Sequence, residues 1–400
     1  MIFAFNGRKD TAGLCEISKR FAVFFLLLLI FNSSLFAFPF SKVETNSSRD
    51  AKPVFVYENK LQTIESEGDS VTVKPVKYTS FPFKPRNISG NLKNLCAWDS
   101  ASQKLFFCDK EGNLKASVKL EAGLVRTNGK FLFAQDKIFE DGFDFSFYEI
   151  KRSFLGRKKL EKLFSVKLDC FVSDTVFCGR GIWFCGGNKN DDENTVYFAD
   201  YVLQKVQKVF STAKNNDFLR LIKCEGEQEA VYGNGTENNS SAEKTVSGTK
   251  TVSGTADNSV SVYAFLSGRL KQHGSLNIYR ISYDFAFGSA YDGSQNAKVS
   301  SINMTESAVF PQDGIGFFGF GLAFENQLLL PVVTENETLS LCVYDTVQKK
   351  IDAFLRNSNG IYFPIGEYEG KSFYIAKDPL SNPDFSQIVY YNGRKITKIK

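Results

Sequence analysis

Hydrophobic residues occur in this chain as short runs of four to seven positions, separated by glycine, asparagine, aspartate and lysine. Runs of this length that are rich in Phe, Val, Tyr and Ile and end at turn-forming residues predict β-strands. They begin near residue 54 and recur to the last residue. Helical periodicity is almost absent, and at 148–164 a helix and a strand-turn-strand interpretation fit equally well. The pattern therefore predicts an all-β fold.

Many of these runs are apolar at consecutive positions, as at 131–133, 182–185 and 328–330. A strand with one wet face would alternate apolar and polar residues, so these strands are expected to be covered on both faces. The blades of a β-propeller provide this environment, because each blade packs between two neighbours. A two-layer sandwich would leave more polar alternation.

Markers of the third strand in successive units give the number of blades. We place them near Leu105, Phe143, Thr195, Leu276, Thr338 and Ser386, with a weaker hairpin near Val54. The units recur about every 40 to 60 residues, which is compatible with one four-stranded blade each. We therefore expect a single β-propeller domain of six or seven four-stranded blades over residues 54–400.

One insertion interrupts this spacing at residues 234–259. It contains the tandem polar repeat 245–249 and 251–255, in which valine is the one apolar residue type. Such a segment cannot form a packed core, and it predicts a disordered surface loop.

The N-terminal residues have the order of a secretory signal. Basic residues precede an apolar core at 21–31, and small or polar residues follow as far as Ala37. Residues 1–37 are expected to be a signal peptide cleaved after Ala37, with cleavage after Ser34 or retention as an anchor as alternatives. Residues 38–53 would be a flexible segment. The protein is then exported, periplasmic or extracellular, without a stable membrane span after cleavage.

Charge and residue types exclude several functions. Removal of residues 1–37 takes away four basic and two acidic side chains and lowers the formal charge from +5 to +3, which favours no nucleic-acid partner.

Seven cysteines remain after this removal. Cys96 and Cys108 could share a face of one hairpin, and buried thiols are the preferred interpretation. No Cys-x-x-Cys pair or Cys/His cluster with zinc spacing occurs.

Candidate catalytic and ligand-binding motifs are weak. His273 is the one histidine and lies in a polar turn, which argues against histidine-based catalysis and histidine-clustered metal centres. The glycine pattern at 314–319 lacks the strand-to-helix context of a dinucleotide site. The acidic loop 188–193 lacks the fixed glycine and distal glutamate of a calcium loop. The basic stretch 151–162 fits an exposed hairpin or a contact with an acidic partner or membrane surface. We therefore assign no catalytic, cofactor-binding or metal-binding residue, and we expect no cofactor.

Two distant segments read as copies of one unit. Residues 181–210 form a strand with the glycine pair Gly186-Gly187, a polar loop, a strand ending at Tyr201, a turn and a strand; residues 327–354 repeat this order, with Tyr344 in the place of Tyr201. The first unit resembles a kelch repeat, and this resemblance implies a kelch-like β-propeller. It concerns the fold and implies no particular ligand.

The expected function is binding. We interpret the chain as an exported, monomeric interaction protein that engages a protein or envelope component through its blade loops. The alternative is a carbohydrate-active hydrolase or lyase that uses acidic residues in the central channel, although no spacing singles out such a pair. A scaffold subunit in envelope assembly is a third interpretation. Whether the chain is an enzyme stays open, and a non-enzymatic role is favoured.

Overall fold

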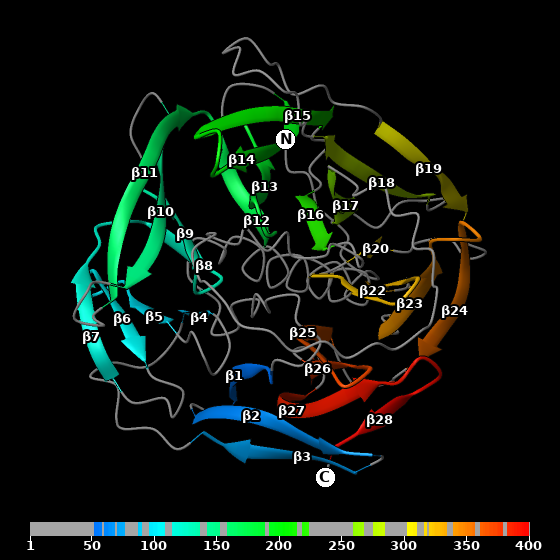
Figure 1. Cartoon of the computed structure of the whole chain (residues 1–400). Helices are drawn as coiled ribbons and strands as arrows, with labels where there is room; N and C mark the ends of the chain where they lie inside the picture. Colours follow the sequence, from blue (N-terminus) through cyan, green and yellow to red (C-terminus); the bar gives the residue numbers. More distant parts are fainter. Residues whose placement is uncertain are drawn as a thin grey trace, which may run out of the picture.

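Figure 1 shows the computed structural model of the chain, in which β-sheets form a ring around a central axis. The structure describes residues 52–57, 60–68, 70–76, 87–89, 96–108, 114–136, 142–152, 158–188, 192–213, 218–223, 259–267, 275–284, 302–309, 316–317, 320–333, 339–356, 361–378 and 382–399. Within these residues all the regular elements are strands, which confirms the predicted all-β fold. They include no helix long and apolar enough to cross a membrane.

The described strands form seven antiparallel sheets, the blades of a seven-bladed β-propeller, numbered here in chain order. Blade 1 contains β1 (Val54–Tyr57), β2 (Lys60–Glu67) and β3 (Ser70–Pro75). Blade 2 contains β4 (Asn87–Ser89), β5 (Cys96–Asp99), β6 (Lys104–Cys108) and β7 (Leu114–Lys119). Blade 3 contains β8 (Leu124–Thr127), β9 (Phe131–Gln135), β10 (Phe143–Arg152) and β11 (Lys158–Leu168).

Blades 4 to 7 follow the same order from the axis outwards. Blade 4 contains β12 (Phe171–Phe177), β13 (Gly181–Gly187), β14 (Glu193–Asp200) and β15 (Lys205–Ala213). Blade 5 contains β16 (Phe218–Lys223), β17 (Ser259–Ser267), β18 (Ser275–Asp284) and β19 (Ile302–Val309). Blade 6 contains β20 (Gly316–Phe317), β21 (Leu322–Phe324), β22 (Gln327–Val333), β23 (Leu339–Asp345) and β24 (Lys350–Arg356). Blade 7 contains β25 (Ile361–Tyr368), β26 (Lys371–Asp378), β27 (Asn382–Tyr391) and β28 (Ile396–Lys398).

The predicted third-strand markers agree with this arrangement. Five of them fall within the third strands of blades 2, 3, 4, 5 and 7, and Thr338 immediately precedes the third strand of blade 6. In blade 6, β20 and β21 both pair with β22, so the inner strand is divided into two short pieces. The ambiguous segment 148–164 belongs to the β10–β11 hairpin and is not helical in its described residues. The predicted signal peptide, the flexible segment up to residue 51, and insertion residues 234–258 lie outside the described residues.

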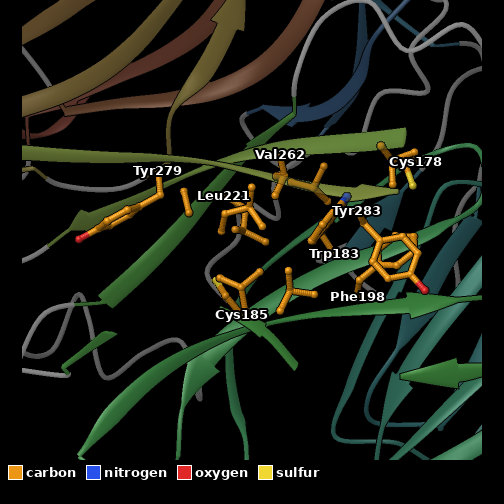
Figure 2. Packing of buried hydrophobic residues seen from close by; sticks show 14 of the residues in the cluster. Cys178, Trp183, Cys185, Phe198, Leu221, Val262, Tyr279 and Tyr283 are labelled. Atoms are coloured by element: carbon orange, nitrogen blue, oxygen red, sulfur yellow. The ribbon is translucent and has the colours of Figure 1, made fainter. Parts of the chain in front are cut away.

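Neighbouring blades share their hydrophobic cores, as two-sided burial requires. In β13, Trp183 and Cys185 pack against blade 5, whereas Ile182 and Phe184 pack against blade 3. Figure 2 shows the first of these clusters, in which Trp183 lies against Phe198 and Tyr283. Full burial of such a side chain contributes about 1.5–3 kcal/mol. The consecutive apolar residues that the sequence displays therefore serve two blade interfaces at once.

The ring closes where blade 1 meets blade 7. Phe55 and Ile64 pack against Phe373 and Ile388. The Tyr57 hydroxyl also donates a hydrogen bond to the Ser386 carbonyl oxygen at 2.8 Å. In the part of the chain that the structure describes, the two blades are separate sheets, so side chains rather than a shared β-ladder join them.

Gly186 permits a close approach between strands. A Cβ atom at this position would lie 2.0 Å from the carbonyl oxygen of Phe171 and 3.0 Å from the Cys170 sulfur. The carbonyl belongs to the backbone of the paired strand β12 and cannot move independently. The glycine that suggested the repeat is therefore required by packing at the end of a strand.

We expect Gly186→Ala to lower the free energy of unfolding by about 1–3 kcal/mol, because the methyl group overpacks the β12–β13 pair. Gly123→Ala is the matched control, since its Cβ would have its nearest neighbour at 3.4 Å. The control should change stability by less than about 1 kcal/mol. Urea unfolding followed by tryptophan fluorescence measures both, and equal losses would contradict the packing argument.

The described cysteines are buried thiols. Cys96, Cys108, Cys170, Cys178, Cys185 and Cys342 form no disulfide. Cys96 is paired in register with Phe107, and Cys108 with Leu114, so the considered bridge does not form. Burial raises the pKa of the Cys96 thiol to about 12 and also raises that of Cys342. Both are thus poor nucleophiles in the folded state.

Iodoacetamide at about pH 8 should label Cys96 and Cys342 at least about a hundredfold more slowly in the native protein than in urea, since burial removes both access and thiolate. Peptide mass spectrometry after timed labelling provides the measurement. Rapid native labelling of either residue would show that its blade opens readily, and a Cys96–Cys108 bridge in unreduced protein would contradict the assignment as thiols.

Candidate interaction surface

The tight turns of several blades lie on one face of the ring. The strands of a blade alternate in direction, so the turn from first to second strand and the turn from third to fourth strand open on the same face. We call this the turn face. Its described turns are 128–130, 178–180, 201–204, 325–326, 346–349, 369–370 and 392–395.

Three turns between third and fourth strands are built in the same way. Asp200 Oδ1 accepts hydrogen bonds from the backbone N–H groups of Val202 and Leu203, at 2.8 and 3.0 Å. Asp345 Oδ1 accepts the equivalent bonds from Val347 and Gln348, both at 2.8 Å. In blade 7, Asn392 Oδ1 caps the N–H groups at 394 and 395. These side chains take the place of missing strand partners and hold each turn in one shape.

This geometry corrects the sequence alignment of the two repeats. Asp200 is paired with Gly181, and Asp345 with Gln327, at the same end of the second and third strands. Tyr344 therefore corresponds to Ala199 instead of Tyr201, so that prediction was wrong. The aspartate that caps the turn, and not the aromatic residue, occupies the equivalent position.

Asp200 has a second function that Asp345 lacks. Its Oδ2 atom accepts a hydrogen bond from Arg180 Nε at 2.7 Å, and the two side chains are 1% and 12% exposed. Tyr283 of blade 5 lies close by; burial, reinforced by the Asp200 carboxylate, raises its pKa to about 12. The turn of blade 4 is thus fixed to the preceding hairpin of its own blade by a buried ion pair.

The capped turns nevertheless present apolar side chains to solvent. Val347 is 70% exposed, Val202 is 56% exposed and Leu203 is 47% exposed. They are the most exposed large hydrophobic residues in the described part of the chain. Val202 and Val347 hold equivalent positions, two residues after the capping aspartate, and their turns belong to blades 4 and 6.

Blade 3 contributes to the same surface. The rings of Phe131 and Tyr201 are stacked, with centroids 4.3 Å apart, and this contact joins the 128–130 turn to the turn of blade 4. Lys130 is exposed beside this stack, with its amine 4.9 Å from the Phe131 ring centroid. Val202 and Leu203 are therefore close in space to an exposed cation of the neighbouring blade.

The turn face of blades 3 and 4 carries an excess of positive charge. Lys158 buries its amine over the Phe107 ring of blade 2 and is not part of this surface; the described strand ends and turns contain six other basic residues, namely Arg126, Lys130, Lys151, Lys159, Arg180 and Lys205. The acidic residues there are Glu149, Glu161 and Asp200. Lys151 lies between Glu149 and Glu161, at 3.4 and 2.9 Å, and Arg180 pairs with Asp200. We call these charged residues, with Val202 and Leu203, the blade 3–4 surface.

A second polar constellation lies between the inner strands of blades 4 and 5. Asp174 accepts the backbone N–H groups of Thr175 and Leu221 at 2.8 and 2.9 Å, and Arg220 donates to the Ser173 carbonyl oxygen. The guanidinium group of Arg220 also lies over the Phe320 ring. Burial lowers the pKa of Arg220, and Asp174 opposes this effect. These contacts join three consecutive blades, so we interpret the cluster as a structural junction.

The motifs considered from sequence gain no support from the described residues. Within the glycine pattern 314–319, Gly316 and Phe317 form β20, and β21 follows where a nucleotide site would need a helix. His273 and loop residues 189–191 lie outside the described residues, and those described contain no group of three His, Cys, Asp or Glu that could hold a metal ion. Burial and Asp144 raise the pKa of Asp136. Asp136 directly follows the second strand of blade 3, beside Gly123 at the start of the inner strand, and Asp144 lies in the third strand.

Sequence reasoning missed the capped turns, although a signal for them was present. The hexapeptides Asp-Tyr-Val-Leu-Gln-Lys at 200–205 and Asp-Thr-Val-Gln-Lys-Lys at 345–350 share aspartate, valine and lysine at the same spacing. Gln204 and Lys349, which precede the shared lysine, both have positive φ, at 52° and 54°. An aspartate followed by a long polar residue four positions later is the recognisable pattern.

Asp200→Ala should cost about 3–5 kcal/mol of unfolding free energy, because it leaves the buried Arg180 charge without its carboxylate. Asp345→Ala removes the same turn bonds without a buried partner, and should cost about 1–2 kcal/mol. The double variant Asp200→Ala/Arg180→Leu should recover part of the larger loss. Denaturant titrations give all three values, and equal costs for the two single variants would refute a distinct contribution of the ion pair.

Comparison with known proteins identifies no family, and three similar solved structures have TM-scores below 0.5. No protein-family model matches the chain, and no curated protein matches its sequence, so the kelch-like resemblance stays a prediction. Kluyvelomyces marxianus Hsv2 is similar over 85% of this chain and 92% of its own, with 9% identity and a TM-score of 0.42. The calcium-binding protein regucalcin from Agrobacterium tumefaciens is similar over 78% and 90%, with 8% identity and a TM-score of 0.39. A prolyl endopeptidase is similar over 98% of this chain and 54% of its own, with 10% identity and a TM-score of 0.46. These similarities concern the overall fold and indicate neither ligand nor activity.

Proposed function

We propose that this β-propeller is an exported interaction protein that binds a protein or envelope component through its turn face. The observation that carries the proposal is the exposure of Val202 and Leu203 on a turn held by Asp200 and Arg180. Export rests on the N-terminal sequence pattern, and binding rests on this surface. A propeller fold by itself is compatible with many functions.

The construction of the turn supports a binding role. A four-residue connection between strands is usually polar, because its backbone and side chains face water. Here a buried ion pair and two hydrogen bonds fix the turn, whereas its two central apolar side chains remain about half exposed. We call Val202 and Leu203 the apolar tip of blade 4. Because the tip is preformed, it loses little conformational entropy when a partner covers it. Stability of the fold alone gives no reason for these two residues to be apolar.

Charged residues around the tip would select the partner. The basic excess of the blade 3–4 surface favours a partner with negative charge, and complementary charge mainly increases the association rate and specificity. The alternative of a channel hydrolase or lyase stays a prediction.

Affinity capture from native envelope extract tests the proposal. The protein in its exported form should retain a specific envelope component, and Val202→Asp/Leu203→Asp should reduce this capture by about tenfold or more through lost apolar contact. Phe171→Asp is the control, since Phe171 is also exposed, at 37%, but begins β12 at the end away from the 178–180 turn and so lies on the opposite face. Thermal unfolding confirms that each variant is folded. Equal capture by the double variant and the control, or capture of nothing above background, would overturn the proposal.

A further inference from the structure

We propose that the blade 3–4 surface docks on an anionic lipid bilayer, with Val202 and Leu203 entering the headgroup region and the surrounding lysines and arginines contacting lipid phosphates. This inference deepens the proposed function by naming the envelope component, and it rests on that function. Three features of the structure support it: the form of the tip, its charge, and the distribution of equivalent turns over the face.

The tip has the form that interfacial insertion requires. Val202 and Leu203 are adjacent at the centre of a short turn and expose 56% and 47% of their surfaces. The stack of Phe131 on Tyr201 supports the turn from the side of blade 3. Apolar side chains that project from a rigid base, with cations beside them, bind the boundary between headgroups and acyl chains.

The charges beside the tip complement an anionic surface. Lys130 lies next to the Phe131–Tyr201 stack, and Lys205 begins β15 directly after the turn. The carboxylate nearest to the tip, Asp200, is engaged by Arg180 and by the turn N–H groups. Lys159 at the hairpin of blade 3 is 58% exposed in its side chain, although it lies 3.8 Å from Glu161, which also pairs with Lys151. Each basic residue near an anionic membrane strengthens binding by about fivefold.

The distribution of equivalent turns favours a flat partner. Val347 of blade 6 occupies the position of Val202 in its own capped turn, and the turn of blade 7 capped by Asn392 opens on the same face in a different register. Figure 1 shows blades 4 and 6 with blade 5 between them. A membrane plane can touch tips that are separated in this way, whereas a protein partner usually covers a continuous patch of about 800 Å².

Acidic residues limit the contact to one sector. Blades 6 and 7 also carry Glu325, Asp345, Asp352 and Glu369 near their turns, which offset Lys349, Lys350, Arg394 and Lys395. Their charge is therefore close to balanced, and the basic excess belongs to blades 3 and 4. The propeller should thus approach the membrane tilted towards the blade 3–4 surface, with the turn of blade 6 as a secondary contact.

Vesicle binding by the exported form of the protein tests the inference. Co-sedimentation should show stronger binding to phosphatidylcholine vesicles that contain about 30% phosphatidylglycerol than to phosphatidylcholine alone, and the difference should shrink as NaCl rises from about 50 to about 500 mM. Val202→Asp/Leu203→Asp should lower the partition coefficient by about tenfold or more. Lys130→Gln should lower it about fivefold.

Matched controls separate this surface from general charge. Lys104→Gln removes an exposed lysine beside the turn between second and third strands of blade 2, which opens on the opposite face. It should leave vesicle binding unchanged, as should Phe171→Asp at the other end of β12. An equal loss of vesicle binding in Lys104→Gln and Lys130→Gln would refute a specific binding surface. Binding that does not depend on the charge of the lipid would refute the electrostatic contact.

The two experiments together distinguish failure of this inference from failure of the proposed function. If anionic vesicles do not bind, but envelope capture yields a protein that the Val202→Asp/Leu203→Asp variant loses, the partner is a protein and the lipid inference is wrong. If neither vesicles nor envelope extract show binding that depends on this tip, both proposals are wrong. Lipid-dependent binding that is lost in the double variant supports both.

Discussion

The middle strands of each blade must hide both of their faces from water, and this requirement organises the molecule. Trp183 and Phe184 are neighbours in β13 and point to opposite sides, yet each is fully buried. A single sheet cannot satisfy such a strand, so a blade needs a partner on each side, and this need extends from blade to blade around the ring. The outer strands are less deeply covered, as β11 shows, in which every residue is intermediate or exposed.

The same requirement allowed the fold to be predicted from the sequence. Consecutive apolar residues at 131–133, 182–185 and 328–330 led to strands covered on both faces, and the structure places each run between two cores. The spacing of third strands predicted six or seven blades, and the structure has seven. The segment 148–164 stayed ambiguous because its apolar residues fit both the periodicity of a helix and that of two strands. The pairing of β10 with β11 decides in favour of the strands.

The surface could not be derived in the same way. Val202 and Leu203 look like ordinary apolar residues of a strand, and their exposure depends on Asp200 ending the strand at that point. The choice of Tyr344 as the equivalent of Tyr201 failed for a related reason. Aromatic residues vary in position because several places in a blade can bury them, whereas an aspartate that caps a turn has one geometry. Contacts such as Arg180–Asp200 and Phe131–Tyr201 depend on the three-dimensional fold, and no local sequence pattern predicts them.

The contact between blades 7 and 1 closes the ring. It joins groups 329 residues apart, at Tyr57 and Ser386, without exchanging a strand between the first and last described sheets. Releasing it would leave the internal hydrogen bonding of every described blade intact and convert a closed ring into an open row of stacked sheets. Such a row depends on nearest-neighbour contacts, as in solenoid proteins. Closure at this interface therefore gives the first and last described blades the same cover on both sides as the blades between them.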